Sequence, residues 1–335
     1  MTIPPLDPDA AARVASFGEI APMRQRGLAA VRVAIESAPR PKDMAVMAQI
    51  EQRNIQGPGG QIPLRIYRPS ADRVGPVLVY FHGGGMVLGS NHSFEPLARA
   101  LAAACDATVV SVEYRLAPES PPPAQFDDAY AATTWVAAHA EELAVDATRL
   151  VVIGDSAGGS LAAAVALAAR DRGGPAIFCQ VLLYPGLDND MAAPSVTLLA
   201  DAPMLTRDDI MFMHELTGKE SGDATSAYRF PAYATDLTRL PQAVVVTAEC
   251  DPIRDWGERY ATRLRDAGVQ TTMTRYPGAY HGFLMRSDAV ARGRLAITEI
   301  GGLLRAKFSH PPTFQTFRSP DDGRPSALPG QQNLG

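Results

Sequence analysis

Cysteine is scarce in this sequence, and no long apolar run is present. The three cysteines among 335 residues, Cys105, Cys179 and Cys250, are widely separated. Their number is odd and their surroundings are apolar, which favours buried thiols over disulfides or a metal site. No stretch approaches the roughly 18 apolar residues that a membrane span needs. Residues 1–10 also lack the basic and apolar segments of a secretory signal, so we expect a cytoplasmic protein.

Clustered positive charge and metal-binding signatures are missing as well. Lysine and arginine total 31 against 36 acidic residues, which gives a formal net charge of -5. Without an extended basic run, nucleic acid is not an expected partner. Neither Cys-x-x-Cys nor His-Glu-x-x-His occurs, and Asp188-Asn189-Asp190 lacks the glycine and distal glutamate of a calcium loop. We therefore expect no metal.

The residues that are present favour a large α/β core. Hydrophobic residues make up 46% of the chain, which is ample for a substantial interior. Short β-branched runs alternate with alanine-rich helical stretches, a pattern typical of a mostly parallel sheet flanked by helices on both faces. The expected strands are Ile62–Tyr67, Val77–Phe81, Thr108–Val112, Leu150–Ile153, Gln180–Leu183, Ala243–Thr247 and Thr271–Tyr276. The expected helices are Phe94–Ala104, Asp127–Leu143, Gly158–Arg170, Asp255–Ala267 and Asp288–Lys307.

Two long segments interrupt this alternation. Residues 1–45 contain two helix-like stretches before the first expected strand, and residues 188–238 separate two strands by far more than an ordinary loop. We expect these segments to pack together as a helical cap above a core formed by 46–187 and 239–308. The final residues, 309–335, are rich in Pro, Gly, Gln and Ser, which predicts an irregular tail.

The hexapeptide Gly154–Gly159, Gly-Asp-Ser-Ala-Gly-Gly, follows an apolar strand and opens an alanine-rich helix. This strand–turn–helix context is the one that a Gly-x-Ser-x-Gly nucleophile requires. The turn strains the serine backbone, and only residues as small as glycine on either side let the strand and the helix approach closely. We predict that Ser156 is a nucleophile and that the amide of Ala157, at the helix start, donates to an oxyanion.

A second glycine-rich segment, His82–Met86, directly follows the expected strand Val77–Phe81. Three consecutive glycines are costly to order, so they indicate a backbone that bends tightly and approaches something closely. In acyl transfer that partner is the developing oxyanion. A phosphate-binding turn does not fit, because neither this loop nor the Ser156 loop has the Gly-x-Gly-x-x-Gly or P-loop spacing. His82 itself is expected to be structural.

The hydroxyl needs a base, and His281 is the best placed of six histidines because it follows the last expected strand. His92, His139, His214 and His310 are expected at the surface. The base needs a carboxylate, and Asp251 follows the strand Ala243–Thr247. Asp255 is the competitor, although a place in the first turn of a helix accounts for it. The order Ser156, Asp251, His281 is that of α/β-hydrolases.

Five motifs together resemble those of the bacterial hormone-sensitive-lipase-like esterases, a branch of the α/β-hydrolases. They are His82–Gly85, Tyr114–Glu119, Gly154–Gly159, Asp251–Asp255 and His281–Phe283. The resemblance covers roughly residues 40–307. It implies an α/β-hydrolase fold with an N-terminal cap and hydrolysis of short- to medium-chain acyl esters without a cofactor. It also implies Asp251 as the triad acid and an oxyanion hole from Ala157 and the glycine loop, chiefly Gly83 and Gly84, with Gly85 as a further candidate.

We therefore predict a serine carboxylesterase that acts on small-molecule esters through an acyl-serine intermediate. Transfer of the acyl group to an alcohol by the same triad stays open. A non-catalytic ligand-binding protein with this fold is a further alternative, which loss of the base usually marks, and His281 is present. A homodimer also stays open.

The sequence says less about the substrate pocket. Methionine and phenylalanine side chains in the second long segment and near the motifs are candidates, since methionine adapts to varied shapes. The residues that we assign to the pocket are Met86, Asp155, Met211 and Phe283.

Overall fold

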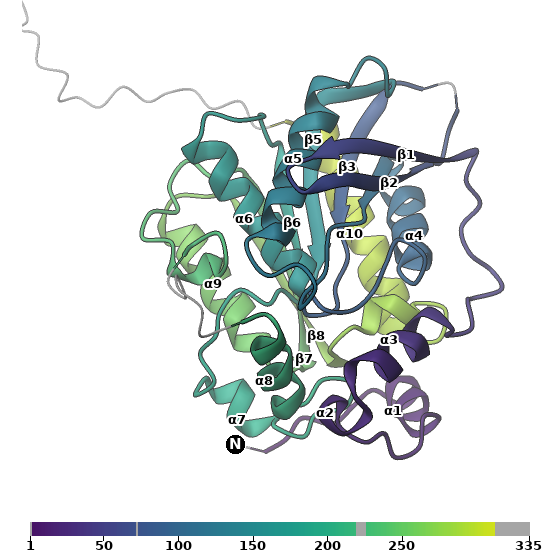
Figure 1. Cartoon of the computed structure of the whole chain (residues 1–335), viewed down its shortest axis with the longest axis vertical. Coiled ribbons are helices and arrows are strands. Elements are labelled where there is room, and N and C mark those ends of the chain that lie inside the picture. The colour runs from purple at the N-terminus through teal and green to yellow at the C-terminus, as the bar shows by residue number, and fades with distance from the viewer. Residues whose placement is uncertain (1, 72, 219–225, 312–335) are drawn as a thin grey trace, which may run out of the picture.

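The computed structural model describes residues 2–71, 73–218 and 226–311. A central sheet with strand order β1-β2-β4-β3-β5-β6-β7-β8 runs through the molecule (Figure 1). The strands are β1 Gln49–Gly57, β2 Gly60–Arg68, β3 Gly75–Phe81, β4 Thr108–Val112, β5 Val145–Asp155, β6 Cys179–Leu183, β7 Gln242–Cys250 and β8 Thr271–Tyr280. Among the strand pairs in the described residues, only β1–β2 and β2–β4 are antiparallel. The mostly parallel α/β sheet predicted from the sequence is confirmed.

The first strand, β1, was not predicted. It forms a hairpin with β2, in which Gln49 pairs with Arg68 and Gly57 with Gly60. Of its nine residues only Ile55 is buried. An edge strand with polar side chains on both faces lacks the apolar run that signals a strand, so its identity comes from pairing rather than from its own pattern.

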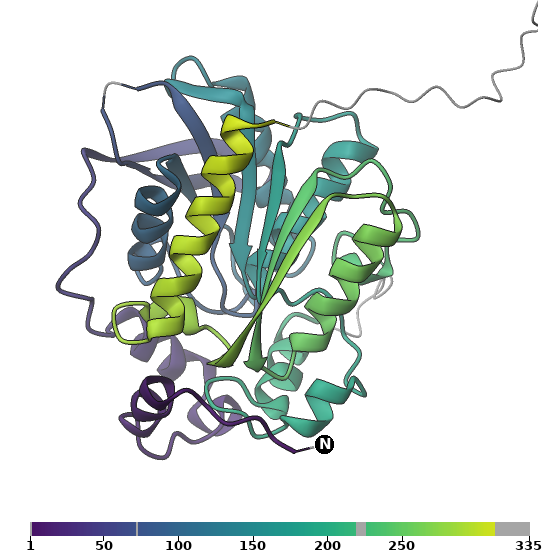
Figure 2. The same ribbon diagram turned by 180° about the vertical axis from the view of Figure 1, so that it is seen from behind.

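Helices cover both faces of the sheet, as Figures 1 and 2 show from opposite sides. Alternate residues of a strand point to opposite faces. In β3, Val77, Val79 and Phe81 join the apolar cluster under α5, α6 and α9, while Leu78 and Tyr80 join the cluster under α4 and α10. These helices are α4 Glu95–Cys105, α5 Ala124–Ala138, α6 Ala157–Asp171, α9 Arg254–Asp266 and α10 Ala291–Ser309.

The two long segments that interrupt the alternation lie side by side, near the end of the sheet to which β7 and β8 point (Figures 1 and 2). The first holds α1 Pro8–Ala15, α2 Met23–Arg26 and α3 Leu28–Glu36, one helical turn more than expected. The second holds α7 Pro194–Leu198, α8 Arg207–Leu216 and a 3₁₀ turn, Pro231–Tyr233. Because these segments come from distant parts of the chain, only tertiary contacts bring them together.

Contacts between α2 and α8 join the two segments. The Met23 amide donates to Asp209 Oδ1 at 2.8 Å, and Arg24 donates two hydrogen bonds to the Glu215 carboxylate at 2.7 and 2.8 Å. Asp209 also completes a capping box with Thr206 at the start of α8. One carboxylate therefore both begins α8 and fixes it to α2.

Helix α10 continues to Ser309, and from residue 312 on the predicted tail lies outside the described residues. Within the described part of the chain, no helix combines the length and the apolar character needed to cross a bilayer.

Candidate active site

Ser156 lies in a tight turn between β5 and α6. Its backbone has φ 53° and ψ -118°, a conformation that side-chain-bearing residues rarely adopt. Space for the turn depends on two glycines. A Cβ on Gly154 would lie 2.2 Å from the Gly158 carbonyl oxygen, and one on Gly158 would lie 1.9 Å from the Phe81 carbonyl oxygen. The strand and the helix thus approach as closely as the glycine pattern predicted.

Three side chains from different elements meet at this turn. The Ser156 hydroxyl lies 2.9 Å from His281 Nε2, and His281 Nδ1 lies 2.7 Å from Asp251 Oδ2. Asp251 follows β7 and is fully buried, while His281 follows β8. The other Asp251 oxygen accepts the amide of Ile253 at 2.9 Å, which holds the carboxylate in place. The arrangement fits a hydroxyl donating to an imidazole whose Nδ1–H donates to a carboxylate.

The contacts of Asp255 and Tyr184 explain why Asp251 is the partner of His281 and how the His281 ring is packed. Asp255, the competitor of Asp251, instead accepts the amide of Ser195 at 2.9 Å and pairs with Arg254. The ring of the buried Tyr184 meets the His281 imidazole edge-on, with centroids 5.1 Å apart. Tyr184 comes directly after β6, and its position at a strand end is the signal that would have identified it.

The glycine loop corrects one expectation. The amide of Gly83 donates to Asp155 Oδ1 at 3.0 Å, so it is not available to an oxyanion. Gly84 and Gly85 have φ of 108° and 63°, which glycine adopts readily. Among the described residues, no group accepts a hydrogen bond from the amides of Gly84, Gly85 or Ala157. Gly85 and Ala157 also line the same cavity as Ser156.

The backbone fixes Gly84 closely. Its carbonyl accepts the amides of Val87 at 3.1 Å and Leu88 at 2.9 Å. A Cβ on Gly84 would lie 2.3 Å from the Leu88 carbonyl oxygen, so no larger residue fits. The loop is therefore held at Gly83 by a side chain and at Gly84 by its own turn.

His82, at the start of this loop, is structural as predicted. It is fully buried and stacks on Tyr114 and Phe94, with centroids 4.4 and 5.1 Å apart. Its Nδ1 lies 2.8 Å from the Gly83 carbonyl oxygen. Burial lowers the pKa of His82 to about 4, so the ring is neutral at pH 7.

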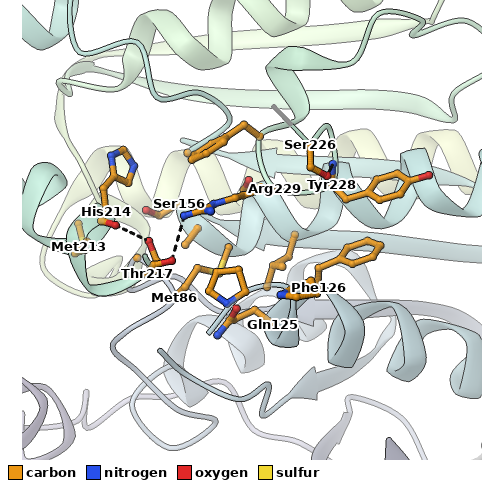
Figure 3. A pocket seen from close by; sticks show the side chains of 18 of the residues that line it. Met86, Gln125, Phe126, Ser156, Met213, His214, Thr217, Ser226, Tyr228 and Arg229 are labelled. Carbon is orange, nitrogen blue, oxygen red and sulfur yellow. Dashed lines mark hydrogen bonds between the residues drawn. The ribbon is translucent and has the colours of Figure 1, made fainter. Parts of the chain in front are cut away.

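A cavity of about 390 Å³ opens above Ser156 (Figure 3). One end is lined by a helical wall, which we define as α8 and Thr217 together with Ser226, Arg229 and Phe230. In this wall the Thr217 hydroxyl donates to the His214 carbonyl at 3.1 Å, and Arg229 Nη2 donates to the Thr217 carbonyl at 3.1 Å (Figure 3). Ile253 and Trp256, from the start of α9 and the loop before it, also line the cavity.

Aromatic rings line the other end of the cavity. Phe126 and Tyr228 stack face to face with centroids 5.0 Å apart. The Arg172 guanidinium lies over both rings, 5.2 Å from one centroid and 5.0 Å from the other. Because Phe126, Tyr228 and Arg172 pack against one another, no space is left between the rings for a ligand.

Of the four residues assigned to the pocket from the sequence, only Met86 lines the cavity. Phe283 is fully buried and packs against Tyr184 and Tyr276 in the core. Asp155 lies behind the glycine loop. Met211 is 37% exposed on the outer side of α8. The assignments of Asp155, Met211 and Phe283 are wrong, because sequence position near a motif does not fix the direction of a side chain.

The spacing of residues along α8 would have identified the residues of this helix that line the cavity. The α8 residues that line the cavity are Ile210, Met213, His214 and the following Thr217, which occupy positions i, i+3, i+4 and i+7 of one helix face. Met211 falls outside this series. His214, expected at the surface, is on the lining face and partly buried.

Comparisons with known proteins identify the family. A family profile described as alpha/beta hydrolase fold matches residues 78–285. The carboxylesterase NlhH of Mycobacterium tuberculosis is 40% identical over 283 residues, which cover 81% of this chain and 89% of the relative. An arylesterase of Saccharolobus solfataricus is 36% identical over 249 residues, covering 74% of this chain and 80% of the relative.

A solved structure gives the same result. A hyperthermophilic esterase from Pyrobaculum calidifontis superimposes with a TM-score of 0.82 at 36% identity, covering 90% of this chain and 98% of the other. The resemblance to esterases inferred from the five motifs is confirmed.

Proposed function

The chain belongs to the α/β-hydrolase fold family and is a carboxylic-ester hydrolase, and from this premise we propose that Ser156 is its nucleophile. The observation that carries the proposal is the line of hydrogen bonds from Ser156 Oγ through His281 to Asp251, with distances of 2.9 and 2.7 Å. A serine hydroxyl at neutral pH needs such a base to attack a carbonyl carbon.

In this proposal His281 removes the Ser156 proton as the hydroxyl oxygen bonds to the ester carbonyl carbon. The resulting imidazolium is stabilised by the buried Asp251 and returns the proton to the leaving alcohol oxygen. Water then enters, gives a proton to His281 and attacks the acyl-serine. Collapse of the second tetrahedral intermediate releases the carboxylic acid and returns the proton to Ser156.

The negative charge on the carbonyl oxygen needs donors that are already in place. We assign this role to the amides of Gly84, Gly85 and Ala157. Two observations support this assignment. Among the described residues no group accepts a hydrogen bond from these amides, and Gly84 and Gly85 have the positive φ angles of a tight turn. The start of α6 adds the positive end of a helix dipole at Ala157.

The substrate assigned to this site is a small-molecule ester with a short to medium acyl chain. A cavity of about 390 Å³ is near the lower end of the range for ligand pockets, roughly 300 to 1,000 Å³. In this proposal the helices of residues 1–45 and 188–238 act as a cap that limits the acyl chain. A cytoplasmic location and a homodimer remain predictions from the sequence.

Hydrolysis of nitrophenyl esters from acetate to dodecanoate tests the proposal. We expect turnover to be fastest for the shorter chains, and Ser156→Ala to lower kcat by about 10⁶-fold. The matched control is Ser111→Ala in β4. This substitution removes a buried hydroxyl that donates to Asn91 Oδ1. This control should keep wild-type kcat. Full activity in Ser156→Ala would refute the assignment of the nucleophile.

Adding an alcohol to the same assay separates hydrolysis from transfer. The proposal expects the free acid as the main product in dilute alcohol. A new ester as the main product would instead identify an acyltransferase.

A further inference from the structure

The carboxylate of Asp155 is buried directly behind the active site but does not touch the cavity. It is 1% exposed and precedes Ser156 in the chain. One of its oxygens, Oδ1, accepts two hydrogen bonds, from the Tyr80 hydroxyl at 2.7 Å and from the Gly83 amide at 3.0 Å. A buried carboxylate is costly, so its place beside the nucleophile calls for a role.

Its two donors belong to one short stretch of chain. Tyr80 lies in β3 and is fully buried, and Gly83 is the second residue of the loop that follows this strand. A Cβ on Gly83 would lie 2.5 Å from Asp155 Oδ2. The carboxylate and the loop backbone are therefore in direct contact, with no room for water between them.

The hydrogen bond from Gly83 decides where the next two amides point. With the Gly83 N–H turned back toward Asp155 and the Gly84 carbonyl held by Val87 and Leu88, the Gly84 and Gly85 amides have little freedom. Oxyanion donors act only when they are fixed before the charge develops. Without the hydrogen bond to Asp155, the loop backbone could rotate at Gly83, and the Gly84 and Gly85 amides would no longer be fixed before the charge develops.

Asp155 also belongs to the turn that carries Ser156, at the last position of β5. The nucleophile and the oxyanion donors come from different segments of the chain. A single carboxylate joins the two segments, because it is covalently next to one and hydrogen-bonded to the other. We expect a loss of this contact to change the distance between Ser156 Oγ and the Gly84 and Gly85 amides.

We propose that Asp155 is a positioning residue for acyl transfer, whose Oδ1 holds the glycine loop so that the Gly84 and Gly85 amides face the oxyanion formed at Ser156. The inference rests on the proposed function, since it assumes those oxyanion donors. Asp155 acts through the loop and does not contact substrate. The acceptor oxygen, rather than the negative charge, performs the role.

Two substitutions of similar shape separate the acceptor from the charge. Asp155→Asn keeps an oxygen that accepts from Gly83 and Tyr80, whereas Asp155→Leu removes it. We expect Asp155→Leu to lower kcat on nitrophenyl butyrate by about 10²- to 10³-fold, the size of losing one oxyanion donor, while KM changes by less than about threefold. Asp155→Asn should keep kcat within about tenfold.

Tyr80→Phe is the matched control, because it removes the other hydrogen bond to the same oxygen but leaves the Gly83 contact. It should lower thermal stability and keep kcat. A purely structural role for Asp155 would instead make Tyr80→Phe and Asp155→Leu lose activity together.

A pair of inhibitors gives a second readout. A trifluoromethyl ketone forms a tetrahedral adduct whose oxyanion needs the donors, whereas the methyl ketone of the same chain binds without one. In Asp155→Leu the preference for the trifluoromethyl ketone should fall by the same factor as kcat/KM. An unchanged preference, or a wild-type kcat, would overturn the inference.

Other results also test the role of Asp155. If Asp155→Leu does not fold, Asp155→Asn still tests the proposal, since a loss of kcat above about 10²-fold in this variant contradicts a role for the acceptor alone. Failure of the underlying function is distinguishable, because it appears as full activity in Ser156→Ala. An inactive Ser156→Ala with a fully active Asp155→Leu would refute only the role of Asp155.

Discussion

The two sides of the cavity are built in different ways. The floor, which we define as Asp251, His281, the turn 154–158 and the glycine loop 83–85, depends on backbone atoms in close contact. The helical wall, α8 and Thr217 with Ser226, Arg229 and Phe230, depends on the packing of side chains. In the floor the position of a single Cβ decides whether the structure can form, whereas in the wall a side chain can change size.

The contacts of each side show the difference. In the floor, hypothetical Cβ atoms on Gly84 and Gly158 meet backbone oxygens at 2.3 and 1.9 Å. In the wall, the links to α2 are the hydrogen bond from the Met23 amide to Asp209 Oδ1 and an ion pair between the half-exposed Arg24 and Glu215. An exposed ion pair of this type contributes little and is screened by salt. We therefore predict that the floor fixes the chemistry and that side chains of the wall can change to suit different substrates.

The largest expected effect is in the floor. Asp251→Asn should lower kcat by about 10⁴-fold, because an amide cannot stabilise the imidazolium and favours the wrong tautomer of His281. Asp255→Asn is the control, since that carboxylate pairs with Arg254 and the Ser195 amide. It should change kcat by only a few-fold. Comparable losses in the two variants would mean that the acid has been misassigned.

Space for the turn gives the second test. Gly158→Ala places a methyl 1.9 Å from the Phe81 carbonyl and should lower the free energy of unfolding by about 3 kcal/mol or more. Gly302→Ala in α10, where nothing lies within 4 Å of the new methyl, should raise it by about 0.5 to 1 kcal/mol. Urea denaturation measures both, and equal effects would contradict the close packing of the floor.

The pH dependence of stability gives a third test. Burial raises the pKa of Asp155 from 3.8 to about 6. The folded state therefore holds more protons than the unfolded state between about pH 4 and 6, and Asp155 lowers stability as the pH rises through this window. His82 acts in the opposite direction, since burial lowers its pKa from 6.5 to about 4, and its contribution is lost as the pH falls from about 6.5 to 4.

Asp155→Asn removes only the first of these contributions. Relative to the wild type, its free energy of unfolding should be higher at pH 8 than at pH 4 by about 3 kcal/mol. Chemical denaturation at the two pH values measures this difference. A constant difference across the pH range would show that Asp155 does not titrate as a buried acid.

The smallest expected effect is in the wall. Met213→Ala opens space beside Gly85, because the Met213 sulfur occupies the position that a Cβ on Gly85 would take. We expect kcat/KM for longer acyl chains to rise by roughly tenfold relative to butyrate, as one or two extra methylenes fit. Met211→Ala, on the exposed side of the same helix, should leave the chain-length profile unchanged. A shift in both variants would show that the wall acts through its stability and not through its shape.

Much of the fold was visible in the sequence because it depends on local patterns. The buried strand Thr108–Val112 was predicted with the bounds that the structure gives, since a central parallel strand is apolar on both faces. The edge strand β1 was missed, since its polar residues form a strand only by pairing with β2. The ends of α5 were misplaced by a few residues, which is usual where no cap defines them.

The sequence by itself determined the order and the identity of the groups that meet at Ser156. A strained turn between glycines and the residues at strand ends are local features, and the parallel sheet brings strand ends to one edge. Only the tertiary structure decided which amide is already occupied, because Gly83 donates to Asp155 across 72 positions in sequence. It also decided that Met213 faces the cavity and Met211 faces solvent. Which acceptor a backbone amide binds depends on groups that are distant in sequence, so a local sequence pattern cannot predict it.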